Sequence, residues 1–254
     1  MLLATDIGNT QVVFGLYEEE NLVADWRVAT EAHKTSDEYA VLLSSFLAQR
    51  KLTLSHISEG VIACVVPPLL TTFEGLFRNY LKVTPLVVGP GVRTGVAILY
   101  DDPREVGADR VANAVAARHF HGVPAIVIDF GTATVFDALS AQGEYLGGAI
   151  APGLAIAAEA LFSYAARLPR VELVAPGNPI GRNNVTSMQS GLFYGYVGLV
   201  EGMIARFQKE LGGRARVIAT GNLAGAIARE IEAIETIDPH LTLKGLKLIY
   251  EMNI

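Results

Sequence analysis

The chain has a single cysteine and few charges for its length. Cys64 is the one cysteine among 254 residues, so no disulfide can form within the chain, which is typical of a reducing compartment. Charged residues make up 18%, and the formal net charge of −6 argues against nonspecific binding to nucleic acid or to an anionic membrane. No basic segment precedes the first apolar residues, so we expect no signal peptide and a cytoplasmic protein.

Several common catalytic motifs are also absent. The sequence contains no Gly-x-x-x-x-Gly-Lys-Ser/Thr loop, which excludes a P-loop nucleotide site, and it contains no Gly-x-Ser-x-Gly nucleophile elbow. The five histidines show no spacing typical of metal ligands, and we expect His119 and His121 to face solvent. These absences set aside two large enzyme classes and a histidine-based metal centre.

One strongly apolar, glycine-rich segment covers residues 190–205. Glu201 interrupts it, and it is shorter than the run of about 18 uncharged residues that a membrane-spanning helix needs. Its glycines recur on one helical face, at Gly191, Gly195, Gly198 and Gly202. The spacing predicts a helix that packs closely on another helix, either in the same chain or in a second subunit.

Two short segments repeat one pattern at a constant offset. Asp6 aligns with Asp129 and Gly8 with Gly131, at a separation of 123 residues in both cases (129 − 6 and 131 − 8). Each copy is an apolar strand, a tight Asp-x-Gly-Asn/Thr turn and a second strand. The repetition predicts two related halves, each offering a polar turn to one shared ligand, as in an enzyme that binds ATP phosphates.

The residue types of these turns suit a phosphate. Glycine has no Cβ to block an approaching ligand, and Asn, Thr and free backbone N–H groups supply donors to phosphate oxygens. An Asp beside a phosphate implies a cation or a water between the two anions. Either turn alone could be an ordinary hairpin turn, but two such turns in equivalent contexts favour phosphate binding.

The order of the predicted elements also repeats. Each half begins with a three-strand meander, at residues 2–28 and 125–150, and continues with helix, strand and helix. This is a duplicated α/β plan with mixed sheets. We expect an N-terminal domain over residues 1–118 and a C-terminal domain over residues 123–254, with a hinge at 121–124.

A third motif, Gly107-Ala108-Asp109-Arg110, stands just before an apolar helical run. Asp109 could be only a helix cap, and Arg110 could form only a surface ion pair. Alternatively, Asp109 accepts the proton of an attacking hydroxyl and is kept ionised by the helix terminus, while Arg110 holds an anionic substrate. A fourth motif, Thr220-Gly221-Asn222, closes a strand and opens a helix, where the base or ribose of a nucleotide could pack.

The ordered set of motifs resembles the type III pantothenate kinases. The resemblance rests on Asp6 to Thr10, on Tyr100 to Arg110 (YDDPREVGADR) and on D-F-G-T-A-T at 129–134. It continues with G-G-A-I-A-P-G-L at 147–154, with 168–171 and with 188–191, and so extends over nearly the whole chain. The family has the actin-like fold of the acetate and sugar kinases, in agreement with the two similar domains expected from the repeat.

The resemblance implies ATP-dependent phosphorylation of the primary hydroxyl of pantothenate, the first step of coenzyme A synthesis. It also implies a monovalent cation, potassium or ammonium, at Asp129, a Mg²⁺ ion that accompanies ATP, and a homodimer with the substrate pocket near the subunit interface. Asp109 is the implied catalytic proton acceptor. The implied ATP-binding residues are Asp6, Ile7, Gly8, Asn9, Thr10, Gln11, Val12, Val13 and Thr132. The implied pantothenate-binding residues are Tyr100, Gly107, Ala108, Asp109, Arg110 and Asn184.

The sequence departs from the family pattern at Asn184, where a Thr is usual, and at Asn222, where a second Gly is common. Two alternatives to a pantothenate kinase follow. One is a kinase of the same fold that acts on another small hydroxylated substrate, which Asn184 would favour. The other is a noncatalytic regulator that binds nucleotide and contacts partners.

Overall fold

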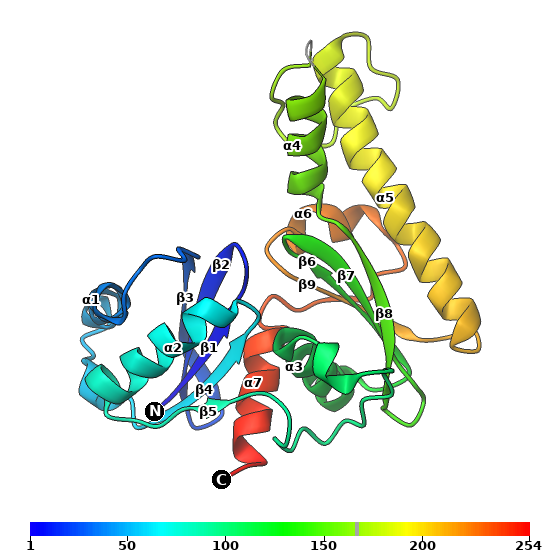
Figure 1. The fold of residues 1–254 in the computed structure, drawn as a ribbon. Coiled ribbons are helices and arrows are strands. Elements are labelled where there is room, and N and C mark those ends of the chain that lie inside the picture. The colour runs from blue at the N-terminus through cyan, green and yellow to red at the C-terminus, as the bar shows by residue number, and fades with distance from the viewer. Residues whose placement is uncertain (166–167) are drawn as a thin grey trace. The chain divides into compact units, whose positions relative to one another are not determined.

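The computed structural model describes residues 1–165 and 168–254, which form two compact units (Figure 1). The first unit comprises Met1–Ala97, Asp101–Ala116 and His240–Ile254. The second comprises Ile98–Tyr100 and Ala117–Pro239. The predicted division at 118 and 123 assigned residues 240–254 to the second domain, whereas their contacts group them with the first unit.

The first unit contains a five-stranded sheet in the order β3-β2-β1-β4-β5. Strand β1 pairs antiparallel with β2 and parallel with β4; β2 pairs antiparallel with β3, and β4 pairs parallel with β5. The strands are β1 (Leu2–Ile7), β2 (Gln11–Glu18), β3 (Asn21–Ala29), β4 (Glu59–Cys64) and β5 (Leu86–Val87). Because β1 is central, the turn that follows it is supported on both sides.

Helices α1 (Ser36–Gln49) and α2 (Pro67–Leu76) pack on one face of this sheet. The ring of Phe73 lies 6.1 Å from that of Phe14 on β2 and 4.5 Å from that of Tyr39 on α1. Thr35 caps α1 in a reciprocal box with Glu38. Helix α2 begins at Pro67, since proline fits the first turn of a helix.

Helices α3 (Ala108–Ala116) and α7 (Leu241–Glu251) belong to the same unit and pack on each other. A Cβ on Gly245 would clash with the carbonyl oxygen of Ala112, so the two helix backbones approach closely. The Thr242 hydroxyl donates to Oδ1 of the buried Asn113, at 2.8 Å. The C-terminal helix therefore supports the helix that carries Asp109.

The second unit repeats the first sheet with the order β10-β9-β6-β7-β8. Strand β6 pairs antiparallel with β7 and parallel with β9, β7 pairs antiparallel with β8, and β9 pairs parallel with β10. The strands are β6 (Ala125–Phe130), β7 (Ala133–Leu139), β8 (Tyr145–Pro152), β9 (Arg216–Thr220) and β10 (Thr236–Ile237). The directions match the first sheet strand for strand, which confirms the predicted duplicated α/β fold.

The helices of the second unit are α4 (Leu154–Tyr164), α5 (Asn184–Glu210) and the short α6 (Ala224–Ile227). Tyr196, Val200 and Ile204 of α5 pack against Ile126 and Ile128 of β6 in one core. With 27 residues at about 1.5 Å each, α5 is much longer than the strands it covers. Its N-terminal part and α4 extend side by side away from the sheet (Figure 1).

Single turns of 3₁₀ or π-helix complete the described elements. They lie at Leu54–His56, Phe77–Leu81, Pro103–Glu105, Ala117–His121 and Ala228–Glu230. Among the described residues, no helix combines the length and apolarity needed to cross a bilayer.

Candidate active site

The first polar turn joins the ends of the adjacent strands β1 and β2. The Gly8 amide donates to the carbonyl oxygen of Gln11 at 3.0 Å, and a Cβ on Gly8 would lie only 3.1 Å from that oxygen. Asn9 and Thr10 at the tip of the turn are exposed. The turn therefore presents two polar side chains from a backbone that glycine allows to fold tightly.

The first turn is also tied to the residue after β3. The Thr30 hydroxyl donates to the Gly8 carbonyl oxygen at 2.6 Å, and the Thr30 amide donates to the Thr10 carbonyl oxygen at 2.9 Å. Neither bond was predicted from the sequence, because Thr30 lies outside the repeated motif. The third strand thus fixes the turn from one side.

Asp109 lies in the first turn of α3. Its Oδ1 accepts a hydrogen bond from the Arg110 amide at 2.8 Å. A Cβ on Gly107 would clash with that same Oδ1 and would lie 3.3 Å from Val65, the residue after β4. Glycine at 107 therefore leaves the room that the Asp109 carboxylate occupies.

Burial raises the pKa of Asp109, although the Arg110 amide and the Arg110 charge act in the opposite direction. Desolvation therefore outweighs the hydrogen bond and the positive charge that favour the ionised form of this carboxylate. A carboxylate with a raised pKa is a stronger base than an ordinary aspartate once it is ionised.

The first turn and Asp109 lie at one edge of the first sheet. In the register of β1 and β4, Asp6 pairs with Ala63, and the Val65 amide donates to the Ile7 carbonyl oxygen at 3.1 Å. Burial raises the pKa of the Cys64 thiol, and the negative charge of Asp6 adds to the rise. Asp6, Cys64, Val65 and the Asp109 carboxylate thus follow one another along the C-terminal ends of two parallel strands.

The second polar turn repeats this geometry between β6 and β7 with one residue fewer. The Gly131 amide donates to the Ala133 carbonyl oxygen at 3.1 Å, and the Gly153 amide donates to the Thr132 carbonyl oxygen at 3.2 Å. Gly153 directly follows β8, as Thr30 follows β3. Both turns are therefore held by the residue that ends the meander.

Asp129 faces the Thr220-Gly221-Asn222 turn. Gly221 has a positive φ of 92°, and a Cβ there would lie 2.5 Å from Asp129 Oδ1 and 2.7 Å from the Phe130 backbone. The Leu223 amide donates to the Phe130 carbonyl oxygen at 3.3 Å. Glycine at 221 therefore leaves room beside a carboxylate oxygen of Asp129.

Tyr100 packs at the start of β8 in the second unit. Its ring lies 6.3 Å from that of Tyr145 and 3.3 Å from where a Cβ on Gly147 would stand. The buried Tyr145 donates its hydroxyl to Oδ1 of the buried Asp137 at 2.8 Å. Tyr100 therefore packs against a buried, hydrogen-bonded part of the second sheet. The sequence did not indicate that Tyr145 and Asp137 support it.

Asn184 is the first residue of α5 and is exposed. The helix cap is the preceding Asn183, which exchanges hydrogen bonds with Thr186. Next to it lies a cavity of ≈ 550 Å³, lined by Pro176, Gly177, Asn178, Pro179, Ile180, Arg182, Asn183 and Thr186. Tyr100 contacts the start of β8. Asn184 begins α5, whose N-terminal part extends beside α4 away from the sheet (Figure 1), so the two residues lie apart within the second unit.

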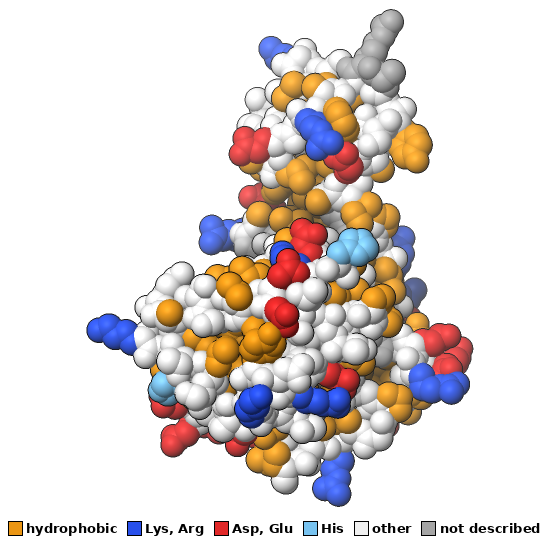
Figure 2. Space-filling view, turned by 60° about the vertical axis from the view of Figure 1, so that its left-hand side comes forward, with side chains coloured by type: hydrophobic (Ala, Val, Ile, Leu, Met, Phe, Trp, Pro, Cys, Tyr) orange, Lys and Arg blue, Asp and Glu red, His pale blue; other side chains and the backbone are white. Residues whose placement is uncertain are grey.

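The glycine face of α5 has no close neighbour among the described residues. A Cβ on Gly191, Gly195 or Gly198 would meet no atom within 4 Å. The partner helix that the spacing predicts is therefore not found in the described part of this chain. Several large apolar side chains of α4, α5 and the segment between them are also exposed, and Figure 2 shows hydrophobic side chains in this part of the surface.

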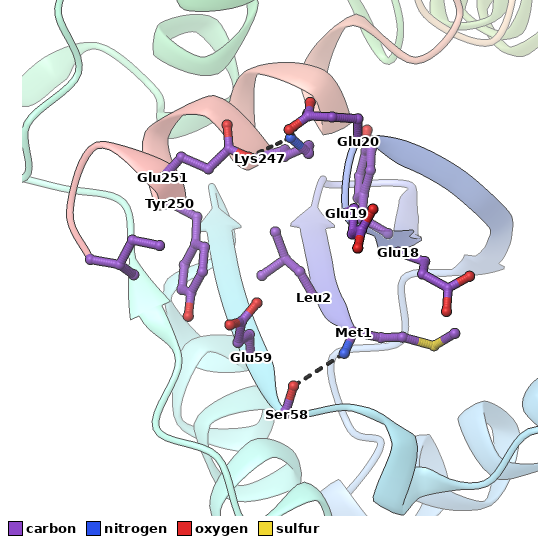
Figure 3. Close-up of a pocket in the computed structure, with 12 residues that line it drawn as sticks. Met1, Leu2, Glu18, Glu19, Glu20, Ser58, Glu59, Lys247, Tyr250 and Glu251 are labelled. Atoms are coloured by element: carbon purple, nitrogen blue, oxygen red, sulfur yellow. Dashed lines mark hydrogen bonds and ion pairs between the residues drawn. The ribbon is translucent and has the colours of Figure 1, made fainter.

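A separate cavity of ≈ 330 Å³ lies at the far end of the first hairpin, among Met1, Glu18, Glu59 and α7 (Figure 3). The buried Lys247 bridges Glu20, at 2.7 Å, and Glu251. Burial lowers the pKa of Lys247, but these two hydrogen bonds outweigh it and leave the pKa raised. Because β1 begins and β2 ends here, this cavity is not part of the candidate active site.

The structure corrects the expected environment of one histidine, and the described residues contain no metal-binding cluster. His121 was expected to face solvent, but its Nε2 lies 3.2 Å from Oδ2 of the buried Asp238, and its side chain is only 17% exposed. Within residues 1–165 and 168–254, no group of three or more His, Cys, Asp or Glu could hold a metal ion.

The sequence profile of the type III pantothenate kinase family matches residues 2–206. The chain belongs to this family. It is 53% identical over 253 residues to the type III pantothenate kinase of Moorella thermoacetica, covering 100% of both chains.

Solved structures show the same fold. A Campylobacter jejuni protein assigned to the Baf family of transcriptional activators is 19% identical, with a TM-score of 0.63 and coverage of 99% of this chain and 98% of that one. The activator of 2-hydroxyisocaproyl-CoA dehydratase from Clostridium difficile, solved with bound ADPNP, is 14% identical. Its TM-score is 0.53, and the match covers 99% of this kinase-family chain and 93% of the activator.

The first unit of this pantothenate kinase family member brings together the predicted residues Asp6 to Val13 and Gly107 to Arg110. The second unit brings together Asp129, Thr132 and the Thr220-Gly221-Asn222 turn. Sequence reasoning missed Thr30, Gly153 and the support of Tyr100 by Tyr145 and Asp137. The offset of 123 residues, which also relates Thr30 to Gly153, was the available signal for the first two.

Proposed function

We propose that this protein transfers the γ-phosphoryl group of ATP to the primary hydroxyl of pantothenate, the first step of coenzyme A synthesis. The observation that carries the proposal is the 53% identity to a type III pantothenate kinase over the whole of both chains. The geometry supports it, because a phosphate-type turn and a buried carboxylate lie along the same strand ends in the first unit.

Asp109 is the proposed proton acceptor. The hydroxyl oxygen of pantothenate forms a bond to the γ-phosphorus, the bond from that phosphorus to the bridging oxygen breaks, and ADP leaves with the electron pair. The hydroxyl proton passes to the Asp109 carboxylate. Phosphoryl transfer depends mainly on positioning and charge stabilisation, so a well-placed weak base suffices.

The proposed ATP-binding residues are the turn from Asp6 to Val13 and Thr132 of the second turn. Backbone amides and the side chains of Asn9, Thr10 and Thr132 supply donors to phosphate oxygens. Asp6 is an anion beside anions and therefore needs a cation or a water between, which the Mg²⁺ that accompanies ATP can provide.

Asp129 is the proposed ligand of a monovalent cation, potassium or ammonium. Support comes from the room that Gly221 leaves next to Oδ1. A cation bound there supplies positive charge that offsets the phosphate charge. Asp129 and the Gly221 turn hold the position.

Pantothenate is proposed to contact Tyr100, Gly107, Ala108, Arg110 and Asn184. Arg110 suits the pantothenate carboxylate, since a guanidinium can bind a carboxylate bidentately. Because Asn184 and Tyr100 lie apart in one chain, we propose a homodimer in which Asn184 comes from the partner subunit. The uncovered glycine face and the exposed apolar side chains of α4 and α5 favour a second copy in that region.

Product identification after incubation with γ-labelled ATP, Mg²⁺ and a panel of hydroxylated acids tests the proposed reaction. We expect label in 4′-phosphopantothenate, and little label with acids that lack the primary hydroxyl. Transfer to another acid but not to pantothenate would establish a kinase with a different substrate and would direct attention to Asn184. ATP binding without transfer to any acid would favour the regulatory alternative.

Sedimentation analysis tests the proposed dimer. We expect the mass of two chains for the wild-type protein and that of one chain for Gly195→Leu, whose side chain would project from the glycine face. A monomeric wild-type protein would contradict the proposal. We also propose a cytoplasmic location. The proposed division into two domains at residues 118 and 123 is kept, except that residues 240–254 group with the first unit.

A further inference from the structure

Thr30 is the residue that directly follows β3, and it contacts the first turn twice. Its hydroxyl donates to the Gly8 carbonyl oxygen at 2.6 Å, and its amide donates to the Thr10 carbonyl oxygen at 2.9 Å. Ala29, the last residue of β3, pairs with Gln11 at the start of β2. Thr30 therefore extends the ladder of β3 and β2 onto the turn itself.

These two bonds fix the orientation of the peptide groups on either side of the tip. In a planar trans peptide, the carbonyl and the following N–H point in opposite directions. Since the Gly8 carbonyl points at Thr30, the N–H of Asn9 points away from Thr30. The hydroxyl of Thr30 thus determines the direction of a donor at the exposed tip.

The second unit has the same backbone contact without the hydroxyl. Gly153 lies 123 residues after Thr30, directly follows β8, and donates its amide to the Thr132 carbonyl oxygen at 3.2 Å. A Cβ on Gly153 would clash with the carbonyl oxygens of Gly131 and Thr132. The shorter second turn is therefore held by close approach of a glycine, whereas the longer first turn is held by a side-chain hydrogen bond.

We propose that Thr30 is a positioning residue for the first phosphate turn, acting through its hydroxyl on the Gly8–Asn9 peptide. This proposal rests on the proposed function, because it takes the turn from Asp6 to Val13 as the ATP phosphate site. Thr30 contacts the carbonyl side of the turn and need not contact the nucleotide.

A turn whose donors are already oriented loses less freedom when the phosphate binds. Removal of the Thr30 hydroxyl should therefore weaken the binding of ATP and leave that of pantothenate unchanged. A residue with only a structural role would lower the melting temperature without this selectivity between the two substrates.

The test compares Thr30→Val, which removes the hydroxyl at nearly constant volume, with Thr30→Ser, which keeps it. Ser45→Ala is the matched control, because the Ser45 hydroxyl also donates to a backbone carbonyl, that of Val41 at 2.8 Å, but on α1. Equilibrium binding of ATP with Mg²⁺ is measured for all four proteins, together with melting temperatures and the two Michaelis constants.

We expect Thr30→Val to bind ATP about five- to tenfold more weakly, as for the loss of one hydrogen bond. We expect Thr30→Ser to stay within about threefold of the wild type, and the KM for pantothenate to be unchanged in both. The Ser45→Ala control should bind ATP as the wild type does.

Wild-type affinity in Thr30→Val, equal losses in the Val and Ser variants, or a parallel rise in both Michaelis constants would overturn the proposal. Absence of ATP binding by the wild-type protein would overturn it as well. Because ATP binding is measured directly, a wild-type protein that binds ATP but does not phosphorylate pantothenate would contradict the proposed function alone.

Discussion

The two units use one strand arrangement to hold two polar turns, but they surround those turns differently. In the first unit, the residue after β4 is Val65, which lies next to Gly107 and the Asp109 carboxylate. In the second unit, the residue after β9 is Gly221, which lies against Asp129. The residue that follows β4 thus lies beside the proposed base, whereas the residue that follows β9 lies beside the proposed cation ligand.

The contacts that hold each turn in place also differ between the two units. Thr30 adds a hydroxyl bond to the first turn, whereas Gly153 approaches the second turn so closely that no side chain fits. The duplicated backbone therefore places a polar turn at the same position in each unit. The chemistry differs at the few residues that stand immediately after a strand.

The strongest test of this difference is Asp109→Asn, which keeps the shape of the side chain and removes the proposed base. We expect turnover to fall about a thousandfold, within the range for loss of a general base, while ATP binding changes little. Steady-state kinetics and equilibrium ATP binding measure the two effects. The matched control is Asp37→Asn, an exposed carboxylate in the first turn of α1, which should retain turnover.

The melting temperature of Asp109→Asn is a second test of the burial of Asp109. A carboxyl whose folded-state pKa is raised adds stability below its unfolded pKa, and that stability is lost as the pH rises through the folded pKa. At neutral pH, Asp109 therefore costs stability, and Asp109→Asn should melt no lower than the wild type. A marked drop in its melting temperature would contradict the role of burial at Asp109.

Asp129→Ala tests the proposed cation site of the second unit. We expect the response of turnover to potassium to disappear, so that rates in sodium and potassium buffers become equal, while the fold is retained. Unchanged potassium stimulation in this variant would place the cation elsewhere. Asp6→Ala, at the aligned position of the first turn, should instead weaken ATP binding and leave the potassium response of residual activity in place.

Gly221→Ala tests whether the glycine is required beside Asp129. The new Cβ would lie 2.5 Å from Asp129 Oδ1, at a residue with a φ of 92°. We expect a loss of roughly 2–4 kcal/mol in the free energy of unfolding and a weaker potassium response. Val65→Ala, at the equivalent place in the first unit, should cost less stability and leave the potassium response intact.

The smallest expected effect is on the pH dependence of kcat/KM for pantothenate. Because the proposed mechanism needs ionised Asp109, kcat/KM for pantothenate should fall as the pH drops through the raised pKa of that carboxyl. The acid limb should lie above the range of an ordinary aspartate. A limb at the ordinary value of 3.8 would contradict the burial of Asp109 as its cause.

The sequence predicts the fold well where its signals are local or repeated. The two Asp-x-Gly turns and the two meanders follow from residue types and their spacing. The β10 strand and α7 were not predicted, because β10 has two residues and α7 lacks a side-chain cap. The return of α7 to the first unit depends on the close approach of Gly245 to Ala112, a contact between residues far apart in the sequence.

The same limit applies to the candidate site. Asp109 stands in a recognisable motif, but its raised pKa depends on burial that only the packed structure reveals. The contacts of Thr30 with Gly8 and of Gly221 with Asp129 join residues 22 and 92 positions apart (30 − 8 and 221 − 129). The open glycine face of α5 was predicted as a packing surface, and the described residues of one chain leave it uncovered.

The measurement that tests the central claim most directly is the rate of ADP formation with pantothenate and Mg²⁺, in matched sodium and potassium buffers. We predict turnover that depends on pantothenate and is stimulated by potassium. Absence of pantothenate-dependent turnover in both buffers, in a folded protein that binds ATP, would contradict the proposed reaction.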